Sequence, residues 1–411
     1  MKPFIVMLCA VVTLSAAPAR FSAYDGTAVS PLLVFVYGSE EYAYYDEYPE
    51  PADYTVSEDY QRRGLDRSPA ERLEIIDRLI KEGHEVKDAV LYCFPLLKKR
   101  IESAKAEIDR EAVESEIRFL PDSFPMFEIK RSEAGRKVDE EQVYNDVYFA
   151  LKRGLKRVAL SVRPVLPEKT AEKLSAYTRL RSEFSTSYSS STPERKHNIT
   201  LALSRINGTV LEAGEVFSFN KIVGKRTAAN GFKEAKIIVD GSYTDGVGGG
   251  VCQASTTVYN AALMAGMKIT AVNRHSLVPT YVEPSFDAMV NGSGSDLKFR
   301  NDGDGPVFIR AYTTSTSVCV KFYSSELPYR ITRRSVTLSM GERPEDVEFT
   351  DTERKYTEGM QSGEKVRVSG GAPAVRSEGW LVLKYPDGKQ EERKIRSDNY
   401  SSSAGRVAVA P

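Results

Sequence analysis

The segment Gly248-Gly-Gly-Val-Cys-Gln-Ala-Ser-Thr-Thr-Val-Tyr-Asn-Ala-Ala-Leu-Met-Ala-Gly266 decides how the central part of this chain folds. Its three glycines permit positive φ angles and close backbone approach, and a helical pattern begins directly after them. Small apolar residues then recur at helical spacing on one face, namely Val258, Ala261, Ala262 and Ala265. The segment therefore predicts a small-faced, buried helix that begins near Cys252 and ends at Gly266.

A thiol at a helix N-terminus lies beside exposed N–H groups and the positive end of the helix dipole. Both favour the thiolate and lower the thiol pKa below its free value of about 8.5. Cys252 is therefore the candidate nucleophile of this chain. The alternative is that Cys252 is a small apolar residue that fills space between a helix and a sheet, which is common for a free cysteine.

The size and charge of the chain limit its architecture and partners. A length of 411 residues favours about two to four domains. Lys plus Arg and Asp plus Glu both number 57, so the net charge gives no attraction to nucleic acid or to an anionic membrane surface. We therefore expect no nucleic-acid partner.

The N-terminus has the pattern of an export signal. Lys2 precedes an apolar run from Phe4 to Ala17, and Ala17-Pro18-Ala19 forms a small-x-small cleavage site. Residues 1–19 are thus predicted to be a signal peptide, and the protein to be secreted or associated with the cell envelope outside the cytoplasm. Membrane contact is expected only if the signal stays uncleaved, because the run is short for a spanning helix.

Cleavage before Arg20 would leave three cysteines, Cys93, Cys252 and Cys319. An odd, sparse set in an exported chain argues against a disulfide framework. At least one thiol then stays free, unless it pairs between molecules. A bridge between Cys93 and Cys319 would leave Cys252 alone, but sequence spacing does not establish it.

The first part of the chain divides into a spacer and a folded region. Residues 40–60 contain eight acidic residues and six tyrosines with no Lys or Arg, which indicates a solvated spacer over residues 20–66. Ser68-Pro-Ala-Glu71 has the pattern of a capping box and predicts a helix to about Glu82. A second helical region, residues 87–118, is expected to break or kink at Pro95.

Residues 67–178 are predicted to form an α+β domain. Phe127-Glu-Ile-Lys130 alternates like a strand, a helix is expected from Asp139 to Gly154, and Val158–Val162 supplies another strand. This run resembles a peptidoglycan-binding domain of exported Gram-positive bacterial proteins. The resemblance implies contact with peptidoglycan and assigns no binding residue.

Residues 179–328 are predicted to form a second α+β domain, with a largely antiparallel sheet. Thr192-Pro193 opens a helix that ends at Asn207-Gly208. Strands are predicted over residues 216–219, 236–240 and 267–272. Because helices and strands do not alternate regularly, a doubly wound parallel sheet is not favoured.

A dense series of motifs runs from about Arg181 to Pro328. It includes Phe217-Ser-Phe-Asn220, Gly248-Gly-Gly-Val-Cys-Gln253, Tyr259-Asn-Ala261, Arg274-His-Ser276, Asp287-Ala288 and Asp296-Leu-Lys-Phe-Arg-Asn301. Together these motifs strongly resemble the VanW family, which is named for an accessory protein in a vancomycin-resistance gene cluster. The resemblance implies a cell-envelope protein and does not fix a mechanism.

The order of three residues suggests a thiol enzyme. His275 follows Cys252 by 23 positions, and Asp287 follows His275 by another 12. A thiol at a helix start, a histidine and an acid on later strands would provide nucleophile, base and orienting group, in an order similar to papain-like and transglutaminase-like enzymes. The alternatives are a histidine held by hydrogen bonds in a loop and an acid at a strand end or turn.

Substrate contacts are expected around this arrangement. The backbone of Gly248–Val251, with Gly249 and Gly250, or the side chain of Gln253 would donate hydrogen bonds to an acyl oxyanion. A substrate carboxylate would be held by basic residues, namely Arg274, Lys225 and Arg226, and the alternative, which is the default for such residues, is that they are exposed, solvated charges. The chain lacks a compact pair of metal ligands such as two histidines at helical spacing, so we expect no metal and no cofactor.

Residues 329–411 are predicted to form a small all-β module. Lys365–Ser369 and Trp380–Tyr385 alternate like strands, and Asp387-Gly388 reads as a turn. The spaced glycines of this part, with Tyr400 near its end, resemble the G-five domain, an extracellular β module linked to cell-wall glycans. The resemblance implies a further envelope-associated module.

Two classes of function remain open at this point. In the first, an exported, modular protein binds or helps to assemble peptidoglycan, and Cys252 is only packed. In the second, a cysteine-dependent hydrolase or acyltransferase acts on cell-wall peptide amides through Cys252 and His275. The expected partner in both is peptidoglycan or another cell-wall glycan or peptide. The first class is favoured slightly, because turnover requires the three residues to meet in space.

Overall fold

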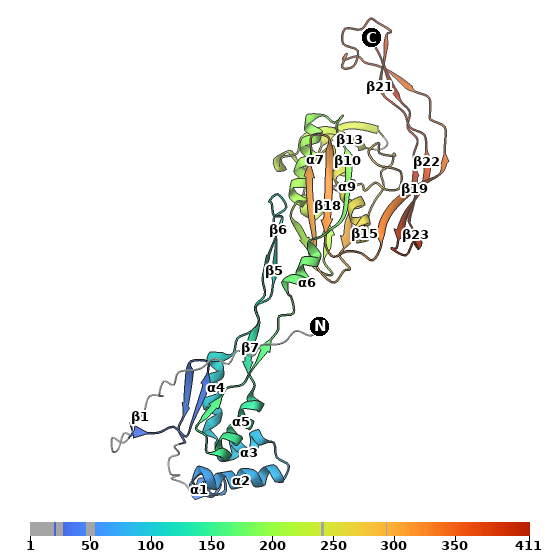
Figure 1. Ribbon diagram of the computed structural model, residues 1–411. Helices are drawn as coiled ribbons and strands as arrows, with labels where there is room; N and C mark the ends of the chain where they lie inside the picture. The colour runs from blue at the N-terminus through green and yellow to red at the C-terminus, as the bar shows by residue number, and fades with distance from the viewer. Residues whose placement is uncertain (1–19, 22–27, 47–53, 240–241, 293) are drawn as a thin grey trace. The chain divides into compact units, whose positions relative to one another are not determined.

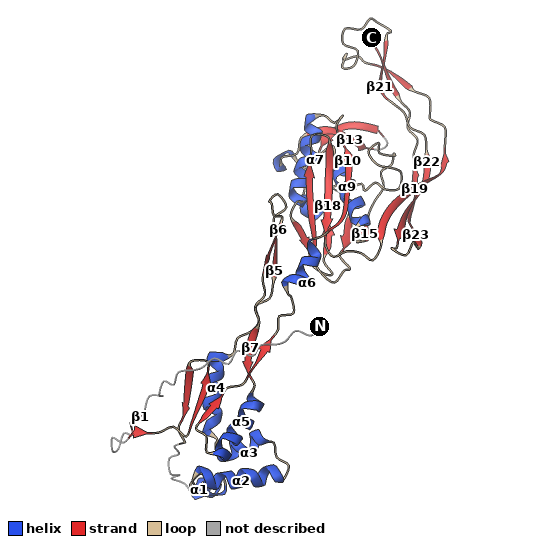
Figure 2. Ribbon diagram, in the orientation of Figure 1, coloured by secondary structure: helices blue, strands red, loops and turns tan. Residues whose placement is uncertain are grey.

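A computed structural model describes residues 20–21, 28–46, 54–239, 242–292 and 294–411. The chain forms two compact units (Figure 1). Unit 1 combines the residues up to Ser115 with Arg131–Thr170, and unit 2 combines Glu116–Lys130 with Ala171–Pro411. Both units contain helices and strands (Figure 2), which confirms a multidomain α+β protein. The predicted signal peptide, residues 1–19, lies outside the described residues.

Unit 1 packs helices against a small sheet. The sheet has the order β4-β3-β8, from β3 (Leu33–Tyr37), β4 (Glu40–Tyr44) and β8 (Arg157–Ala159). Two further pairs are β1 (Arg20–Phe21) with β2 (Ala28–Val29), and β7 (Gly135–Val138) with β9 (Val162–Val165). The helices are α1 (Tyr54–Arg62), α2 (Pro69–Lys81), α3 (Val86–Cys93), α4 (Leu96–Ile108) and α5 (Glu140–Arg153). Apolar side chains of β3, α3, α4 and α5 meet in one core.

The prediction of a solvated spacer over residues 20–66 is wrong for the segment that forms β3 and β4. Tyr42 and Tyr44, at alternate positions of β4, are buried in the core of unit 1. The Tyr44 hydroxyl donates to Asp46 at 2.8 Å, and Asp46 forms a buried ion pair with Arg72 of α2. The high charge of the segment favoured a spacer in the prediction, although the tyrosines at every second position have the spacing of a strand with one buried face.

Helix signals are confirmed where a cap defines the end. Ser68 and Glu71 form the predicted capping box at the start of α2, each accepting from the other's backbone N–H. Gly154 has a φ of 66° and ends α5. Pro95 separates α3 from α4 as expected. Helix α4 ends earlier than predicted, because Arg110 already pairs with β7 in an antiparallel bridge.

The central part of unit 2 is an α+β domain whose sheets are antiparallel, as predicted. The main sheet has the order β10-β18-β17-β11, a smaller sheet has the order β12-β16-β15, and β13 pairs with β14. The strands are β10 (Leu180–Ser187), β11 (Thr209–Leu211), β12 (Val216–Ser218), β13 (Glu234–Val239), β14 (Ser242–Val247), β15 (Lys268–Ala271), β16 (Lys298–Arg300), β17 (Val307–Thr313) and β18 (Ser317–Tyr323).

Helix α9 (Val251–Met264) is buried on almost every side. It contacts β10 and β18 of the main sheet and also α7 (Pro193–Ile206). All residues from Gln253 to Leu263 are buried, rather than one face alone. Small side chains let the helix approach neighbours closely all around, so this helix organises the domain core. The shorter helices of unit 2 are α6 (Ala171–Ser175) and α8 (Phe219–Val223).

The glycines before α9 are required by packing. A Cβ on Gly249 would lie 2.7 Å from the backbone of Ala235 on β13. Gly250 has a φ of 100°, and a Cβ there would lie 2.8 Å from Cγ of Arg195. The side-chain amide of Asn198 on α7 donates to the Gly249 carbonyl at 3.0 Å. The glycine loop thus fixes the position at which α9 begins.

Residues 329–411, the C-terminal β module, are all β as predicted. One sheet has the order β19-β22-β23 and the other β20-β24-β21. The strands are β19 (Arg330–Met340), β20 (Val347–Thr350), β21 (Lys365–Ser369), β22 (Val375–Lys384), β23 (Gln390–Tyr400) and β24 (Arg406–Val409). Only β20 and β24 run parallel among the strand pairs described in this module.

The hairpin of β5 (Glu116–Phe119) and β6 (Phe127–Lys130) groups with unit 2, not with the predicted domain of residues 67–178. Phe119 and Phe127 stack with ring centroids 5.1 Å apart, and both contact Phe308 of β17. Contacts between residues so distant in sequence cannot be predicted from local periodicity. Among the described helices, none combines the length and apolar character needed to cross a membrane.

Candidate functional site

Cys252 lies in the first turn of α9 and is partly exposed. The N-cap residue is Gly250, which offers no side chain to the helix N–H groups. The backbone N–H of Val251 bonds to Gly248 and that of Gln253 bonds to Gly250. The Cys252 thiol lies 3.3 Å from the carbonyl oxygen of Val290. The structure therefore places the thiol at the positive end of the helix, as the sequence predicts.

His275 and Asp287 form a tight pair beside this thiol. Nδ1 of His275 lies 2.7 Å from Oδ2 of Asp287, and the backbone N–H of His275 donates to the same oxygen at 2.6 Å. The imidazole also interacts with the Cys252 thiol, and this interaction shifts the pKa of both groups. Because Nδ1 is bonded to the acid, Nε2 is the ring nitrogen left to exchange a proton with the thiol. The three predicted catalytic residues are thus brought together in the predicted order.

The pair is removed from water. His275 is 5% exposed and Asp287 is 0% exposed. Burial lowers the pKa of His275, but the hydrogen bonds to Asp287 and Cys252 outweigh burial and raise this pKa to about 9. Burial raises the pKa of Asp287, and the hydrogen bond from His275 with the charge of Arg396 brings it below its ordinary value. The acid therefore stays ionised.

The thiol has the opposite shift from an ordinary buried cysteine. Burial raises the pKa of Cys252, but the hydrogen bond and positive charge of His275, with the Arg226 guanidinium, bring it below its ordinary value. Both shifts favour a thiolate at Cys252 and an imidazolium at His275. This is the charge state that a cysteine nucleophile requires.

Two residues that hold Asp287 were missed by the sequence analysis. The Tyr400 hydroxyl donates to Oδ1 of Asp287 at 2.6 Å, and Nη2 of Arg396 donates to the same atom at 2.9 Å. Both come from β23 of the C-terminal β module. They lie more than a hundred residues from Asp287 in the chain, so no spacing or motif indicated the contact.

Arg226 and Tyr281 complete the surroundings of the thiol. Nη2 of Arg226 donates to Oδ1 of Asn220 at 2.6 Å, and the side chain packs beside Gly248 of the glycine loop. Burial holds the pKa of Tyr281 well above the usual range, and the negative charge of Cys252 acts in the same direction. Arg226 was predicted as one of three basic residues near the site, whereas Tyr281 had no assigned role.

Four predicted substrate-binding residues have other contacts. Gln253 is 1% exposed, and its amide donates to Thr186 and to the carbonyl of Ser187, so the structure contradicts its role as an oxyanion donor. Gly249 and Gly250 are explained by packing, as described above. Arg274 is exposed and donates to the carbonyl of His275, with its guanidinium 5.9 Å from the centre of the Tyr400 ring.

The other thiols and possible metal ligands that the structure describes do not form a second site of this kind. Burial raises the pKa of Cys93 to about 11 and also raises the pKa of Cys319. Cys93, Cys252 and Cys319 are all free. Within the described ranges, no group of three or more His, Cys, Asp or Glu side chains is arranged to hold a metal ion.

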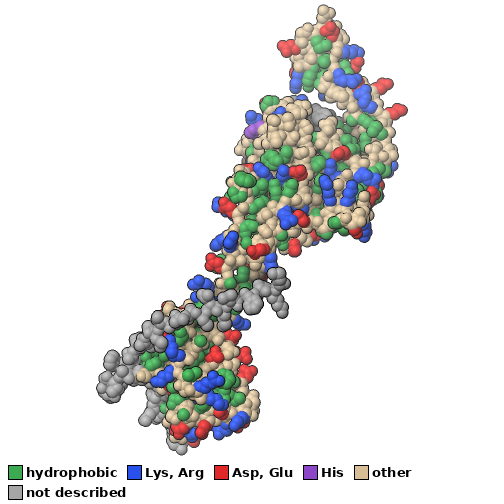
Figure 3. All heavy atoms as spheres, in the orientation of Figure 1, with side chains coloured by type: hydrophobic (Ala, Val, Ile, Leu, Met, Phe, Trp, Pro, Cys, Tyr) green, Lys and Arg blue, Asp and Glu red, His purple; other side chains and the backbone are tan. Residues whose placement is uncertain are grey.

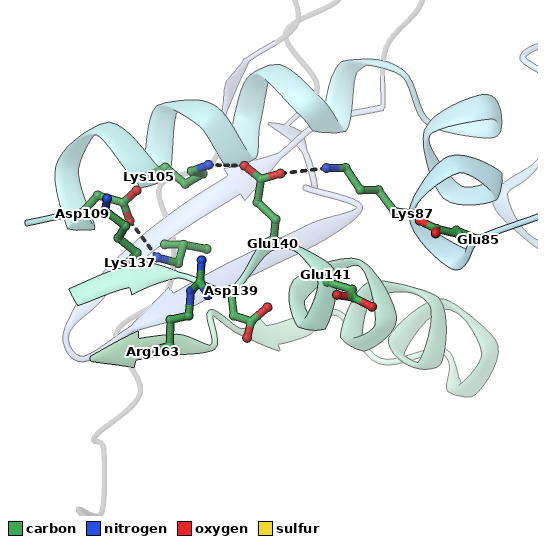
Figure 4. Close-up of a pocket in the computed structure, with 10 residues that line it drawn as sticks. Glu85, Lys87, Lys105, Asp109, Lys137, Asp139, Glu140, Glu141 and Arg163 are labelled. Carbon is green, nitrogen blue, oxygen red and sulfur yellow. Dashed lines mark hydrogen bonds and ion pairs between the residues drawn. The ribbon is translucent and has the colours of Figure 1, made fainter. Parts of the chain in front are cut away.

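Unit 1 contains a pocket of about 480 Å³ with a charged lining (Figure 4). Glu140 at the start of α5 pairs with Lys105 of α4 and, at 2.9 Å, with Lys87 of α3. These two lysines lower the pKa of Glu140 to about 2. Lys137, Arg163 and several further acids also line the pocket. On the molecular face drawn in Figure 3, basic and acidic side chains are interspersed, in agreement with the balanced composition.

Residues 194–323 match the family described as VanW like protein. The α+β domain that carries the thiol site is therefore a VanW-like domain, and the predicted resemblance is confirmed. Its relatives include "Uncharacterized protein YoaR" of Bacillus subtilis, 35% identical over 190 residues, which are 46% of this chain and 63% of the relative. They also include "Vancomycin B-type resistance protein VanW" of Enterococcus faecalis, 31% identical over 113 residues, which are 26% of this chain and 41% of that protein.

The matched stretches thus span less than two thirds of the length of these curated relatives. A solved structure, the crystal structure of HP0197-G5, is covered to 96% by 20% of this chain, with 11% identity and a TM-score of 0.11. A TM-score this low does not establish a shared fold. The G-five resemblance of the C-terminal β module therefore stays a prediction.

Proposed function

We propose that this protein is a cysteine-dependent hydrolase or acyltransferase that acts on peptide amides of the cell wall. The observation that carries the proposal is the buried His275–Asp287 pair, with Nδ1 2.7 Å from Oδ2, whose imidazole interacts with the partly exposed Cys252 thiol at the start of α9. The sequence slightly favoured a binding role, because binding does not require Cys252, His275 and Asp287 to lie close together. Their convergence removes that reason and supports the enzymatic role.

The arrangement can perform acyl transfer in two steps. The Cys252 thiolate attacks the amide carbonyl carbon, the C–N bond breaks, and His275 Nε2 gives its proton to the leaving amine, which yields a thioester. Water or an acceptor amine then loses a proton to His275 and attacks the thioester. The C–S bond breaks, and a carboxylic acid or a new amide leaves as the thiol site is restored. Asp287 keeps the imidazole oriented through both steps.

A backbone donor for the oxyanion is present at the helix start. Among the described residues, none accepts a hydrogen bond from the backbone N–H of Cys252. This N–H lies at the positive end of α9 and next to the attacking sulfur, where it can donate to the carbonyl oxygen on which negative charge develops as the thiolate attacks. The neighbouring N–H groups of Val251 and Gln253 are already bonded. Arg226 supplies positive charge on the loop side of the thiol.

The cell-wall substrate and the location outside the cytoplasm rest on sequence and on the name of one relative. Residues 1–19 have the pattern of an export signal. One relative is named as a vancomycin resistance protein, and this supports a role in the cell envelope. Peptidoglycan peptides contain the amides that a thiol acyl-transfer site would attack, so they are the substrate class that we assign.

A direct test is to incubate the purified protein with soluble peptidoglycan fragments and to identify released or newly joined peptides by mass spectrometry. Turnover that requires Cys252 and His275 is the expected result. Cys93→Ala is the matched control, since that thiol lies in the core of unit 1. Turnover that survives in Cys252→Ala would exclude the proposed mechanism.

A second candidate function is binding or assembly of peptidoglycan without turnover. It is favoured by the charged pocket of unit 1, whose lysines, arginine and acids suit a ligand that carries both charge signs. Sedimentation with purified peptidoglycan at moderate salt tests this role. We expect co-sedimentation of the wild type and weaker co-sedimentation of Lys137→Ala with Arg163→Ala. Protein that stays in the supernatant would count against binding.

A further inference from the structure

We propose that the C-terminal β module completes the thiol site, with Arg396 and Tyr400 as positioning residues for Asp287. This inference rests on the proposed function and deepens it. A VanW-like domain that lacked this module would keep Cys252, His275 and Asp287 but would leave half of the Asp287 carboxylate without a protein partner. The module would then be part of the thiol site and not only a separate domain.

The Asp287 carboxylate is shared between two parts of unit 2. Oδ2 accepts both hydrogen bonds from His275, within the VanW-like domain. Oδ1 accepts from the Tyr400 hydroxyl and from Arg396, both in the C-terminal β module. Because Asp287 is 0% exposed, each oxygen depends on protein donors instead of bulk water. The orientation of the carboxylate is thus set from both sides.

Arg396 donates two hydrogen bonds to Asp287. Nη2 donates to the carboxylate, and Nη1 donates to the backbone carbonyl of the same residue at 2.8 Å. The guanidinium is itself held by Asp398 at 2.5 Å, and its charge interacts with Tyr259 of α9. The same helix carries Cys252 at its start. Arg396 therefore links the acid to the helix that presents the nucleophile.

Tyr400 links the two segments that carry the histidine and the acid. Its hydroxyl donates to Asp287 and accepts from the backbone N–H of Ser285 at 2.8 Å. The next residue, Ser401, donates its backbone N–H to the carbonyl of Ser276 at 2.8 Å. Ser276 directly follows His275 in the chain. The end of β23 thus fixes the backbone on both sides of the His275–Asp287 pair.

Contacts away from Asp287 dock the module independently of this pair. Nη1 of Arg333 on β19 donates to Asn260 of α9 at 2.6 Å, and the guanidinium lies 4.5 Å from the centre of the Phe286 ring. The Ser335 hydroxyl donates to the carbonyl of Pro284 at 2.8 Å. Docking and positioning can therefore be tested with different substitutions.

Loss of the Oδ1 partners should act on His275 through Asp287. An unpaired buried carboxylate oxygen is costly, so the carboxylate would rotate or recruit water, and its hydrogen bond to Nδ1 would weaken. The imidazolium would then be less stable, and the Cys252 thiolate with it. Tyr400→Phe changes no charge, and Arg396→Lys keeps the positive charge but cannot bond both Asp287 atoms at once.

The experiment measures the pKa of His275 by NMR and the alkylation rate of Cys252 against pH, both in the full chain. The chain has three histidines, so the imidazole signals can be assigned by substitution. In Tyr400→Phe and in Arg396→Lys we expect the pKa of His275 to fall by about one unit, a tenfold change in its protonation equilibrium. Alkylation of Cys252 near pH 6.5 should fall by about the same factor.

Three matched variants separate positioning from general effects. Arg393 lies on the same strand, and among the described residues its ion-pair partner is the half-buried Glu391, so Arg393→Lys is one control. Tyr385→Phe also removes a hydroxyl from Glu391. Ser335→Ala removes a docking contact that does not touch Asp287. All three should keep the wild-type pKa of His275. An equal shift in Ser335→Ala would mean loosened docking and would overturn the positioning role.

The outcomes distinguish this inference from the proposed function. If wild-type Cys252 reacts at low pH and the β23 variants leave the pKa of His275 unchanged, the positioning role is wrong and the thiol site stands. If wild-type Cys252 reacts only as an ordinary thiol, the proposed function fails, and the pKa of His275 in Tyr400→Phe still decides whether β23 positions Asp287.

Discussion

Cys93 and Cys252 are both cysteines at helix ends with arginines nearby, yet their thiols differ in chemistry. Cys93 ends α3 and is 0% exposed, and burial raises its pKa to about 11 although Arg72 acts in the opposite direction. Cys252 begins α9, and its pKa is lowered although burial opposes the shift. A nearby cation does not by itself make a buried thiol reactive.

The difference lies in helix polarity and in a direct partner. Cys93 sits at the negative end of its helix dipole, whereas Cys252 sits at the positive end. The pKa of Cys252 is also lowered by the imidazole of His275, which Asp287 holds in place. Proton transfer between the two groups replaces a neutral pair with an ion pair inside the protein. The comparison predicts that changes at the two thiols will have different kinds of effect.

The largest expected effect is the loss of turnover in Cys252→Ala. Removing the nucleophile should lower kcat by a factor on the order of 10⁴ or more, as for other nucleophile-base units. Cys93→Ala should keep the kinetic constants and lower the free energy of unfolding by roughly 1 kcal/mol, because it leaves a small cavity in the core of unit 1. Steady-state kinetics and urea denaturation of both variants check this. Equal losses of kcat in the two variants would contradict the assignment of Cys252, and not Cys93, as the nucleophile.

The next largest effect is expected in Asp287→Asn. The amide can present an N–H to Nδ1 and favour the wrong tautomer of His275, so kcat should fall by up to about 10⁴. The pKa of His275 should also drop from about 9 toward its ordinary value. NMR titration and kinetics measure the two effects. Asp351→Asn, which removes another buried acid within the C-terminal β module, should leave the His275 titration unchanged.

Most of the fold around the thiol could be predicted from local sequence. The Gly248–Gly266 segment predicted α9 because glycines and small-residue spacing are properties of neighbouring positions. The order of Cys252, His275 and Asp287 was also sufficient to predict their meeting. The prediction from local sequence was wrong for Gln253. Its position beside Cys252 suggested an exposed hydrogen-bond donor, but its buried amide donates to Thr186 and Ser187 of β10.

The missing part of the site depends on contacts between distant segments. Arg396 and Tyr400 lie on β23, whose many charged residues are typical of a solvent-facing strand in a separate module. The alternation of polar and apolar residues along this strand does not identify the side chains that contact Asp287. The buried tyrosines of β4 were missed for a related reason. Their burial follows from pairing with β3 and from packing against helices, whereas the charge of the segment is a local property.

A smaller effect is expected in the pH dependence of stability. The pKa of His275 is raised in the folded protein to about 9, so its contribution is fully present below the unfolded pKa of about 6.5. The contribution is lost as pH rises through 9. The difference in free energy of unfolding between wild type and His275→Gln, measured in urea from pH 6.5 to 10, should therefore shrink with rising pH. A difference that grows with pH would contradict the charge assignment.

The smallest effect is expected at the ion pairs of unit 1. The Glu140 side chain is 33% exposed, so its pairs with Lys87 and Lys105 are screened by solvent. Glu140→Gln should lower the free energy of unfolding by about 1 kcal/mol or less. Cys252 alkylation should not change in this variant. Urea denaturation and alkylation kinetics on the same preparation measure both quantities.

The most direct test of the central claim is the alkylation rate of each cysteine against pH in the native protein, resolved by peptide mass spectrometry. Cys252 should react rapidly well below pH 8, and Cys93 should react only on unfolding. In His275→Ala the reaction of Cys252 near neutral pH should fall by at least tenfold, to that of a thiol with a pKa of about 8.5 or above, whereas His197→Ala should behave as wild type. If Cys252 instead stays unreactive until the protein unfolds, as Cys93 does, then it is a packed cysteine and the account of a thiol enzyme is wrong.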